Sequence, residues 1–426
     1  MRIACVIHRF GADIAGGSEG HCLQVARRLA ASHDVTVLTT CARDHVTWRN
    51  EYSAGATTID GGGAAASRLR VERFPVARER SLGRFAEISN TVFDGRPSER
   101  EQEEWFRENG PESPALLDRL ARGGSTFDRI LFWSFRYYHA FFGLPLVADR
   151  AILLPTAEED EAIRLDVLDR FFSLPAAFMF LTPEEQQLVA RRCSQPLAPF
   201  SVVGCGIEAS APTANAVRLL DSLNIARPFA LYLGRVDPNK GCDTLLRYFR
   251  WIHGDTDRQL WNGSVPLPRL VVAGPVNMPL PNDAPWLTSL GYVDAALRDA
   301  LLSQSSALIV PSPYESLSMV LIEAWNHGTP ALVSGRCAAL KGQAIRSGGA
   351  LYYRSVDEFA QGLAYLLGRP DAARQIGANG LAYVEREYRW PQVMDRIEEL
   401  LCSLPSPASR LSSPSAGLSA ASSARA

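Results

Sequence analysis

Residues 307–324 read ALIVPSPYESLSMVLIEA. The stretch opens with a strand-sized apolar run over 307–312, and a short loop that carries Glu315 follows. After that loop the spacing of the apolar residues predicts a helix over 316–327. A buried strand that passes through a short loop into a helix is typical of the βαβ units of parallel sheets.

The same alternation of strand and helix runs along the chain to about residue 400. In the first half we expect strands at 3–7, 34–40, 69–76, 129–134, 151–156, 177–182 and 200–204, with helices such as 18–32 and 183–193. In the second half we expect strands at 229–235, 269–275, 307–312 and 330–334, and helices at 242–252, 295–304, 316–327, 356–367, 371–388 and 392–400.

The alternation is interrupted at 209–215, a segment rich in Ala, Ser, Pro and Thr, and then begins again. We therefore predict an α/β fold with two Rossmann-like domains, residues 1–208 and 209–389, which face each other across a cleft. Ligands of open parallel sheets bind beyond the carboxyl ends of the strands. The cleft is therefore the expected site.

Three segments lie outside this plan. A C-terminal helix is expected over 390–402, and whether it crosses back to the first domain is left open. Residues 403–426 are rich in Ser, Ala and Pro without a periodic apolar face, which predicts a disordered tail. The composition of 53–67 predicts a flexible loop.

Composition excludes several classes of protein. The 44 basic and 46 acidic residues leave a formal charge of −2, which argues against a nucleic-acid partner. No apolar run approaches the ~18 residues that span a bilayer. The apolar run after Arg2 is shorter than the ~7–15 residues of a signal-peptide core. The eight cysteines include no pair at metal or redox spacing, so we expect a reduced, cytoplasmic chain.

Two glutamates stand eight positions apart in the stretch quoted first. Glu315 would project into the cleft and Glu323 would lie two turns down the helix, so the pair could contact different parts of one elongated ligand. The N–H groups of Ser316, Leu317 and Ser318 would be unpaired at the helix start, where phosphate or sugar oxygens bind. The alternative is a solvated pair of glutamates on an ordinary helix.

A second motif, LYLGRVDPNKG at 231–241, also lies where an expected strand gives way to a helix. It places Arg235 and Lys240 at the mouth of the cleft, a planar fork and a point charge that suit a diphosphate. The flanking Gly234 and Gly241 let a backbone approach a ligand closely. The alternative is a pair of ordinary surface cations.

A third motif is Gly16-Gly17-Ser18-Glu19, just before the first expected helix. Two glycines at a helix N-terminus can form a cradle for an anion or a sugar. A plain loop would use the same residues.

In combination these motifs resemble glycosyltransferase family 4. The resemblance covers about residues 1–400, and it implies the GT-B fold and a retaining, metal-independent enzyme that uses a nucleotide-sugar as substrate and needs no cofactor. It implies that Arg235 and Lys240 bind the diphosphate, that Glu315 and the amides after it contact the transferred sugar, and that Glu323 holds the ribose. The catalytic residues implied are Arg235, Lys240 and Glu315, and the donor-binding residues are Gly16, Gly17, Gly234, Ser316, Leu317, Ser318 and Glu323.

The chain departs from the family at Glu158, on the sugar and acceptor side, where relatives commonly have a histidine. The expected partners are a nucleotide-sugar donor and a glycan or lipid-linked acceptor with a hydroxyl group. Many members of the family work on lipid-linked or polysaccharide acceptors at the inner face of the membrane, so contact of this cytoplasmic chain with that face is left open.

Two alternatives remain beside a glycosyltransferase. One is a sugar-nucleotide epimerase on the same fold, and the other is a sugar-nucleotide-binding protein without activity, which the acidic segment around Glu158 suggests. Two other sequence patterns are weak evidence for a binding site. The segment 204–209 matches a loose dinucleotide fingerprint without a helix behind it, and 255–257 is an acidic triplet in a hydrophilic loop.

Overall fold

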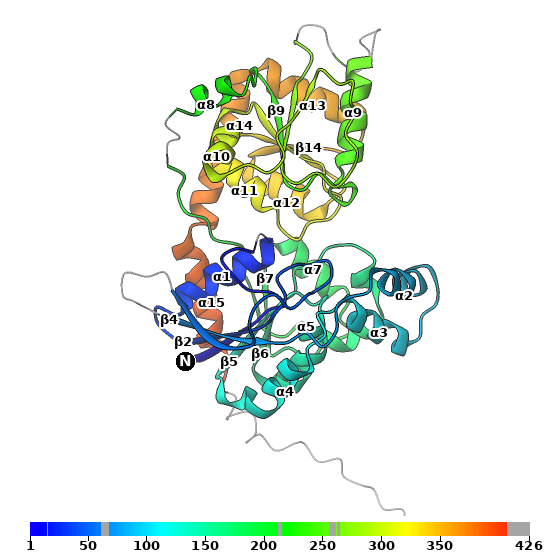
Figure 1. Cartoon of the computed structure of the whole chain (residues 1–426). Coiled ribbons are helices and arrows are strands. Elements are labelled where there is room, and N and C mark those ends of the chain that lie inside the picture. Colours follow the sequence, from blue (N-terminus) through cyan, green and yellow to red (C-terminus); the bar gives the residue numbers. More distant parts are fainter. Residues whose placement is uncertain (15, 61–67, 212–214, 255–260, 262–264, 407–426) are drawn as a thin grey trace, which may run out of the picture.

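The computed structural model describes residues 1–14, 16–60, 68–211, 215–254, 261 and 265–406. These residues form two α/β domains stacked one above the other (Figure 1), each built on its own sheet. The two-domain, parallel-sheet class predicted from the sequence is confirmed.

The first domain contains an eight-stranded sheet in the order β3-β4-β2-β1-β5-β6-β7-β8. Its neighbours pair in parallel except β3 and β4, which are antiparallel. The strands are β1 (Arg2–Val6), β2 (Asp34–Thr40), β3 (Gly55–Asp60), β4 (Arg68–Phe74), β5 (Arg129–Trp133), β6 (Ala151–Leu154), β7 (Ala177–Phe180) and β8 (Phe200–Val202).

The second domain contains a parallel six-stranded sheet in the order β11-β10-β9-β12-β13-β14. Its strands are β9 (Ala230–Leu233), β10 (Leu270–Ala273), β11 (Leu287–Ser289), β12 (Ala307–Val310), β13 (Ala331–Ser334) and β14 (Ala350–Tyr353). The central strands are buried except for the last residue of β9, because helices cover both faces of the sheet.

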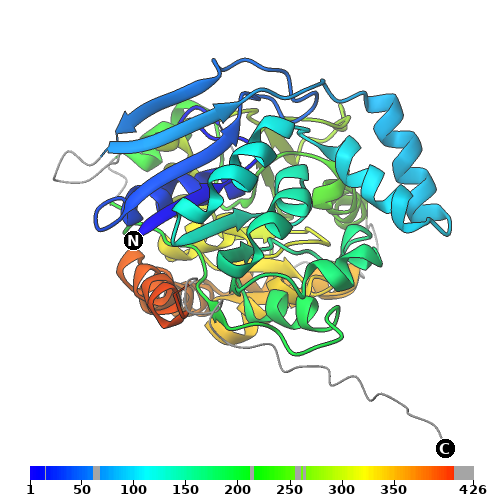
Figure 2. The ribbon, with the colours of Figure 1, turned by 90° about the horizontal axis from the view of Figure 1, so that it is seen from below.

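Helices fill the connections between strands. In the first domain they are α1 (Gly17–Leu29), α2 (Leu82–Asp94), α3 (Glu99–Asn109), α4 (Pro114–Gly123), α5 (Tyr138–Gly143), α6 (Val167–Phe171) and α7 (Pro183–Ala190). The later helices are α8 (Ala216–Ser222), α9 (Cys242–Gly254), α10 (Ala295–Gln304), α11 (Met319–Asn326), α12 (Ala338–Ser347), α13 (Val356–Gly368), α14 (Pro370–Glu387) and α15 (Trp390–Ser403). Seen from below, α2 and α3 project from one side of the first domain (Figure 2).

Helix α15 follows α14 of the second domain but packs on the first domain (Figure 1). Its buried face includes Val393, Ile397 and Leu401, and it lies against β8. Just after the helix, Arg129 of β5 donates a hydrogen bond to the Leu404 carbonyl at 2.6 Å. The last helix therefore ties the two domains together beside their connecting segment, where the Ile207 N–H donates a hydrogen bond to the Tyr388 carbonyl at 2.7 Å.

One local prediction for the first domain was wrong. Residues 55–60 form β3 rather than a flexible loop, because they pair along their whole length with β4. An exposed edge strand of Gly, Ala and Thr has no apolar alternation to reveal it.

Some predicted segments lie outside the described residues. They are 61–67 of the predicted loop, 212–214 of the interrupting segment, the acidic triplet 255–257 and 407–426 of the predicted tail. Within the described part, no helix has the length and apolar character needed to cross a membrane.

Candidate functional site

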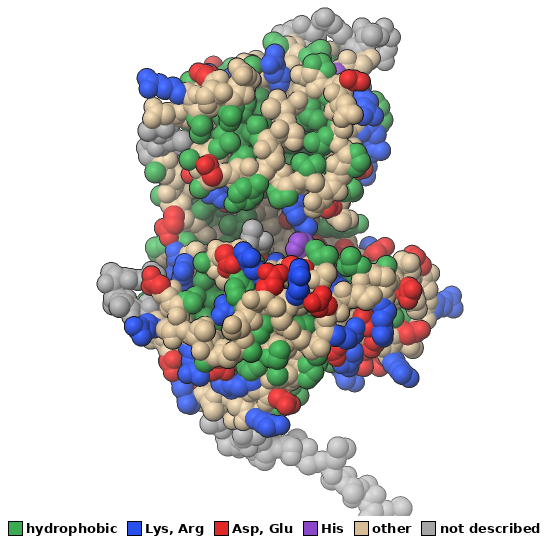
Figure 3. All heavy atoms as spheres, in the orientation of Figure 1, with side chains coloured by type: hydrophobic (Ala, Val, Ile, Leu, Met, Phe, Trp, Pro, Cys, Tyr) green, Lys and Arg blue, Asp and Glu red, His purple; other side chains and the backbone are tan. Residues whose placement is uncertain are grey.

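A cavity of about 860 Å³ lies between the two domains. It is lined where strands of both sheets end: His8, Ser134 and Thr156 follow strands of the first domain, and Arg235 and Tyr314 follow strands of the second. In Figure 3 the molecule is hollowed between its two lobes, and charged and histidine side chains gather along the first-domain edge of the groove. The cavity thus occupies the position where parallel sheets bind ligands.

Lys240 and Glu315 meet on the second-domain wall of this cavity. Lys240 ends the short 3-10 helix Pro238–Lys240, and its Nζ lies 2.8 Å from Oε1 of Glu315. Burial by itself would lower the pKa of Lys240, but the charge and hydrogen bond of Glu315 outweigh it and raise that pKa. Two residues 75 positions apart in the sequence therefore form one charged pair on the cavity wall.

Arg235 lines the same cavity and, among the residues that the structure describes, forms no ion pair. Its backbone carbonyl accepts a hydrogen bond from the Tyr232 hydroxyl. Gly234, just before it, has a φ of +145° and does not itself line the cavity. A guanidinium without a carboxylate partner, close to an ammonium, is suited to an anionic ligand.

Gly241 fixes the position of Lys240. Its φ is +75°, and a Cβ there would lie 2.5 Å from the Pro311 carbonyl oxygen, a backbone atom that cannot move aside cheaply. We expect Gly241→Ala to lower the free energy of unfolding by about 2–4 kcal/mol through backbone strain and overpacking. Urea denaturation measures this.

Gly83 in α2 offers the control, because a Cβ there would meet no heavy atom within 4 Å. Gly83→Ala should leave stability unchanged or raise it by about 1 kcal/mol. Equal effects of the two substitutions would contradict the packing argument.

The helix after Glu315 begins later than predicted. Helix α11 starts at Met319 with Ser318 as its N-cap, so Ser316 and Leu317 belong to the loop. The reason is that the preceding carbonyls have tertiary partners. The Thr182 hydroxyl donates to the Ser316 carbonyl at 2.9 Å, and the Cys337 thiol donates to the Glu315 carbonyl at 3.6 Å. Ser316 and Leu317 still line the cavity, whereas Ser318 does not.

Glu323 does not line the cavity either. It lies on α11, where Oε1 is 3.3 Å from a guanidinium nitrogen of Arg298. Burial raises the pKa of Glu323 despite that arginine. The structure thus separates Glu323 from the Lys240–Glu315 pair.

The first domain contributes Gly16 and Gly17 at the start of α1. A Cβ on Gly16 would collide with the carboxyl group of Glu19, which is buried beside His8 and Arg9. Burial would raise the pKa of Glu19, but His8 and Arg9 outweigh it and hold that pKa at about 2. The glycine therefore leaves room for a buried ionic cluster.

His8 and Arg9 are cavity residues that sequence reasoning missed. Both follow β1 directly, and position after a central parallel strand was the signal that could have found them. Arg136, after β5, was missed for the same reason. Its guanidinium lies 2.6 Å from Asp160 and 3.5 Å from Glu158.

Glu158 therefore lines the cavity as part of a charged cluster. Burial raises its pKa, although the charge of Arg136 opposes this. The acidic segment behind it is held in place by Glu185 of α7, whose two carboxyl oxygens accept hydrogen bonds from the Ala157 and Leu181 N–H groups at 2.7 and 2.6 Å. Within the described ranges, no three His, Cys, Asp or Glu side chains are grouped closely enough to hold a metal ion.

Two Rossmann-like domains with a ligand-sized cavity between them define the GT-B fold. Residues 227–369, which contain most of the second domain, match the sequence profile of the family described as Glycosyl transferases group 1. A comparison with curated proteins finds no match.

Among solved structures the chain is similar to sucrose-phosphate synthase from Thermosynechococcus elongatus, with 19% identity, a TM-score of 0.67 and coverage of 95% of this chain and 98% of that one. It is also similar to an E. coli trehalose-6-phosphate protein bound with UDP-2-fluoro glucose (14% identity, TM-score 0.65, 94% and 99% covered). A third similar structure is Anabaena HepE in complex with UDP and glucose (13% identity, TM-score 0.64, 95% and 100% covered). These likenesses establish the fold.

Proposed function

We propose that this protein is a retaining glycosyltransferase of family 4 that moves a sugar from a nucleoside-diphosphate sugar to a hydroxyl group of a glycan or lipid-linked acceptor. The observation that carries the proposal is the Lys240–Glu315 pair, which stands with the unpaired Arg235 in an interdomain cavity. The cavity volume of about 860 Å³ falls in the range of small-molecule sites. The family profile over 227–369 and the UDP-bound neighbours add support.

In the proposed reaction the acceptor oxygen forms a bond to the anomeric carbon, and the bond from that carbon to the diphosphate oxygen breaks. The electron pair of the broken bond stays on the diphosphate, and an oxygen of the diphosphate accepts the hydroxyl proton. Negative charge on the leaving group thus grows in the transition state, where preorganised cations lower the barrier most. Arg235 and Lys240 are placed to supply that charge.

Glu315 has two roles in this proposal. Without ligand it neutralises Lys240, and with donor bound it would position the transferred sugar while Lys240 turns to the diphosphate. The amides of Ser316 and Leu317, which have no hydrogen-bond partner among the described residues, are available to the donor. Closure of the two domains over the bound donor would exclude water, which favours transfer over hydrolysis.

The test begins with a thermal-shift panel of UDP, GDP, ADP and dTDP, followed by a diphosphate-release assay with the matching sugar donors and a mixed set of acceptors. We expect one nucleotide to raise the melting temperature. Glu315→Gln should lower the rate of transfer about 100-fold, and EDTA should leave it unchanged. Retention predicts that the product keeps the anomeric configuration of the donor, which NMR coupling constants report.

Glu385→Gln is the control, because Glu385 is exposed on α14 and should leave the rate unchanged. Donor interconversion without acceptor would instead indicate the epimerase. Tight nucleotide binding without turnover on any mixture would indicate a binding protein. Full activity of Glu315→Gln would contradict the assigned site.

A further inference from the structure

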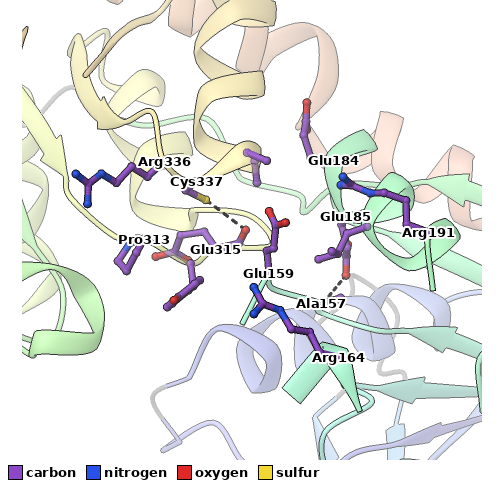
Figure 4. Close-up of a pocket in the computed structure, with 14 residues that line it drawn as sticks. Ala157, Glu159, Arg164, Glu184, Glu185, Arg191, Pro313, Glu315, Arg336 and Cys337 are labelled. Atoms are coloured by element: carbon purple, nitrogen blue, oxygen red, sulfur yellow. Dashed lines mark hydrogen bonds between the residues drawn. The ribbon is translucent and has the colours of Figure 1, made fainter. Parts of the chain in front are cut away.

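A second, smaller cavity of about 330 Å³ adjoins the first. Tyr314 and Glu315 line both cavities, so they form the wall that the two share. The rest of the smaller cavity is built from 157–164 and α7 of the first domain and from the start of α12 of the second (Figure 4). Its volume is at the lower end of small-molecule sites, large enough for a group the size of a sugar.

Three arginines stand around this smaller cavity (Figure 4). Arg164 and Arg191 come from the first domain and Arg336 from the second. All three are exposed, and none forms an ion pair with a carboxylate of the described residues. Elsewhere in the chain arginines beside carboxylates do pair, as Arg78 does with Glu108 at 2.8 Å.

The carboxyl groups of this cavity are mostly neutralised. Glu184 is paired with Arg346, and Glu315 with Lys240. Burial raises the pKa of Glu185 to about 8, so this side chain is largely uncharged at neutral pH. Glu159 is left as the one lining carboxylate, among those described, that can oppose the three guanidinium groups. The lining of the cavity therefore carries a net positive charge.

The start of α12 adds to that charge. Cys337, Ala338 and Ala339 line the cavity at the first turn of this ten-residue helix. The N-cap side chain forms no capping bond to the helix, since the Cys337 thiol donates to the Glu315 carbonyl. The positive end of the helix dipole thus faces the same space as the arginines.

We propose that this smaller cavity binds an anionic group of the sugar acceptor, a carboxylate or a phosphate monoester. The inference rests on the proposed glycosyltransferase function. An acceptor anchored by Arg164, Arg191 and Arg336 would present its hydroxyl group at the shared wall of Tyr314 and Glu315, beyond which the donor sugar would lie. The chain then selects acceptors by charge as well as by shape.

Isothermal titration tests this with three probes of similar size: glucose, glucuronate and glucose 6-phosphate, each added to the full chain saturated with its nucleoside diphosphate. We expect at least one charged probe to bind about tenfold or more tightly than glucose, with an affinity that falls as salt rises. The two charged probes distinguish a carboxylate site from a phosphate site.

Arg336→Gln and Arg164→Gln should each weaken the charged probe about tenfold and leave the affinity for the nucleoside diphosphate unchanged. Arg218→Gln, at an exposed position of α8, is the matched control and should change neither. Because all three positions are exposed, the variants should fold, and their melting temperatures check this.

Equal binding of the three probes, or arginine variants without effect, would overturn the anionic acceptor while the nucleotide binding still supported a glycosyltransferase. A chain to which no nucleoside diphosphate binds would overturn the proposed function and this inference with it.

Discussion

Replacing Lys240 with methionine should reduce sugar transfer about 100- to 1,000-fold, the cost of removing one preorganised group that stabilises transition-state charge. Methionine keeps much of the length of the side chain but removes the charge that lies 2.8 Å from Glu315. The leaving diphosphate would then face Arg235 alone. Steady-state kinetics with the preferred donor measure the loss, which should fall mainly on kcat because the charge develops in the transition state.

The chain supplies an unusually direct control, because Lys240 and Lys341 are its two lysines among 44 basic residues. The Nζ of Lys341 lies over the ring of Tyr352 on the second domain and touches neither cavity. Lys341→Met should keep full activity. In an acylation experiment read by mass spectrometry, bound nucleoside diphosphate should protect Lys240 and not Lys341.

Two results would contradict the role of Lys240. One is unchanged transfer by Lys240→Met, and the other is equal acylation of both lysines with and without nucleotide. Loss of activity together with a collapsed melting temperature would indicate a structural role, since Glu315 is left without its partner in a mostly buried position.

Glu185→Gln should remove a large part of the pH dependence of stability. Burial raises the pKa of Glu185 to about 8, although its hydrogen bonds from backbone N–H groups oppose this. The folded state therefore keeps a proton that the unfolded state has released above a pKa of about 4.5. Stability must then fall as pH rises from about 5 to 8, by up to about 1.4 kcal/mol per pH unit on account of this one group.

The glutamine variant cannot titrate, so this contribution to the slope disappears. At pH 5 the variant should be less stable by about 1–2 kcal/mol, because the amide NH₂ cannot accept one of the hydrogen bonds from Ala157 and Leu181. Because wild type loses up to about 1.4 kcal/mol per pH unit, the two curves should cross near pH 6, and at pH 8 to 9 the variant should be the more stable protein. Urea midpoints measured every half pH unit test this, with the exposed Glu385→Gln as a control that keeps the wild-type slope. Parallel curves for Glu185→Gln and wild type would contradict the raised pKa.

Several elements could be predicted closely because their residues carry strong local signals. The buried strand 34–40 and the helix 295–304 were predicted with the bounds that the structure has. Strand β3 could not be predicted from the sequence, because an exposed edge strand of small residues gains its stability from hydrogen bonds to β4 rather than from an apolar face. Helix α11 was placed three residues early because tertiary contacts to Thr182 and Cys337 take up the carbonyls of Ser316 and Glu315.

The residues of the candidate site likewise fall into two groups, those that a local sequence motif reveals and those that only the tertiary structure brings together. Arg235, Lys240 and Glu315 were identified from motifs in which glycine, charge and strand end coincide within a few residues. Arg136 carries no such motif, and its pairing with Asp160 follows from the adjacency of β5 and β6 in the sheet. The arginines of the smaller cavity are likewise dispersed over 164–336, and they converge because α7 and α12 pack across the domain boundary.

The amino-acid order alone was enough to predict two mostly parallel sheets and to single out Arg235, Lys240 and Glu315, which line one interdomain cavity. Periodicity and helix starts are short-range properties, and each can be read within about ten residues. Only the folded structure shows which charges are neutralised, which remain unpaired and which cavities they line. The reason is that electrostatic pairing depends on distance in space. Lys240 and Glu315 are 75 positions apart in sequence and 2.8 Å apart in the protein.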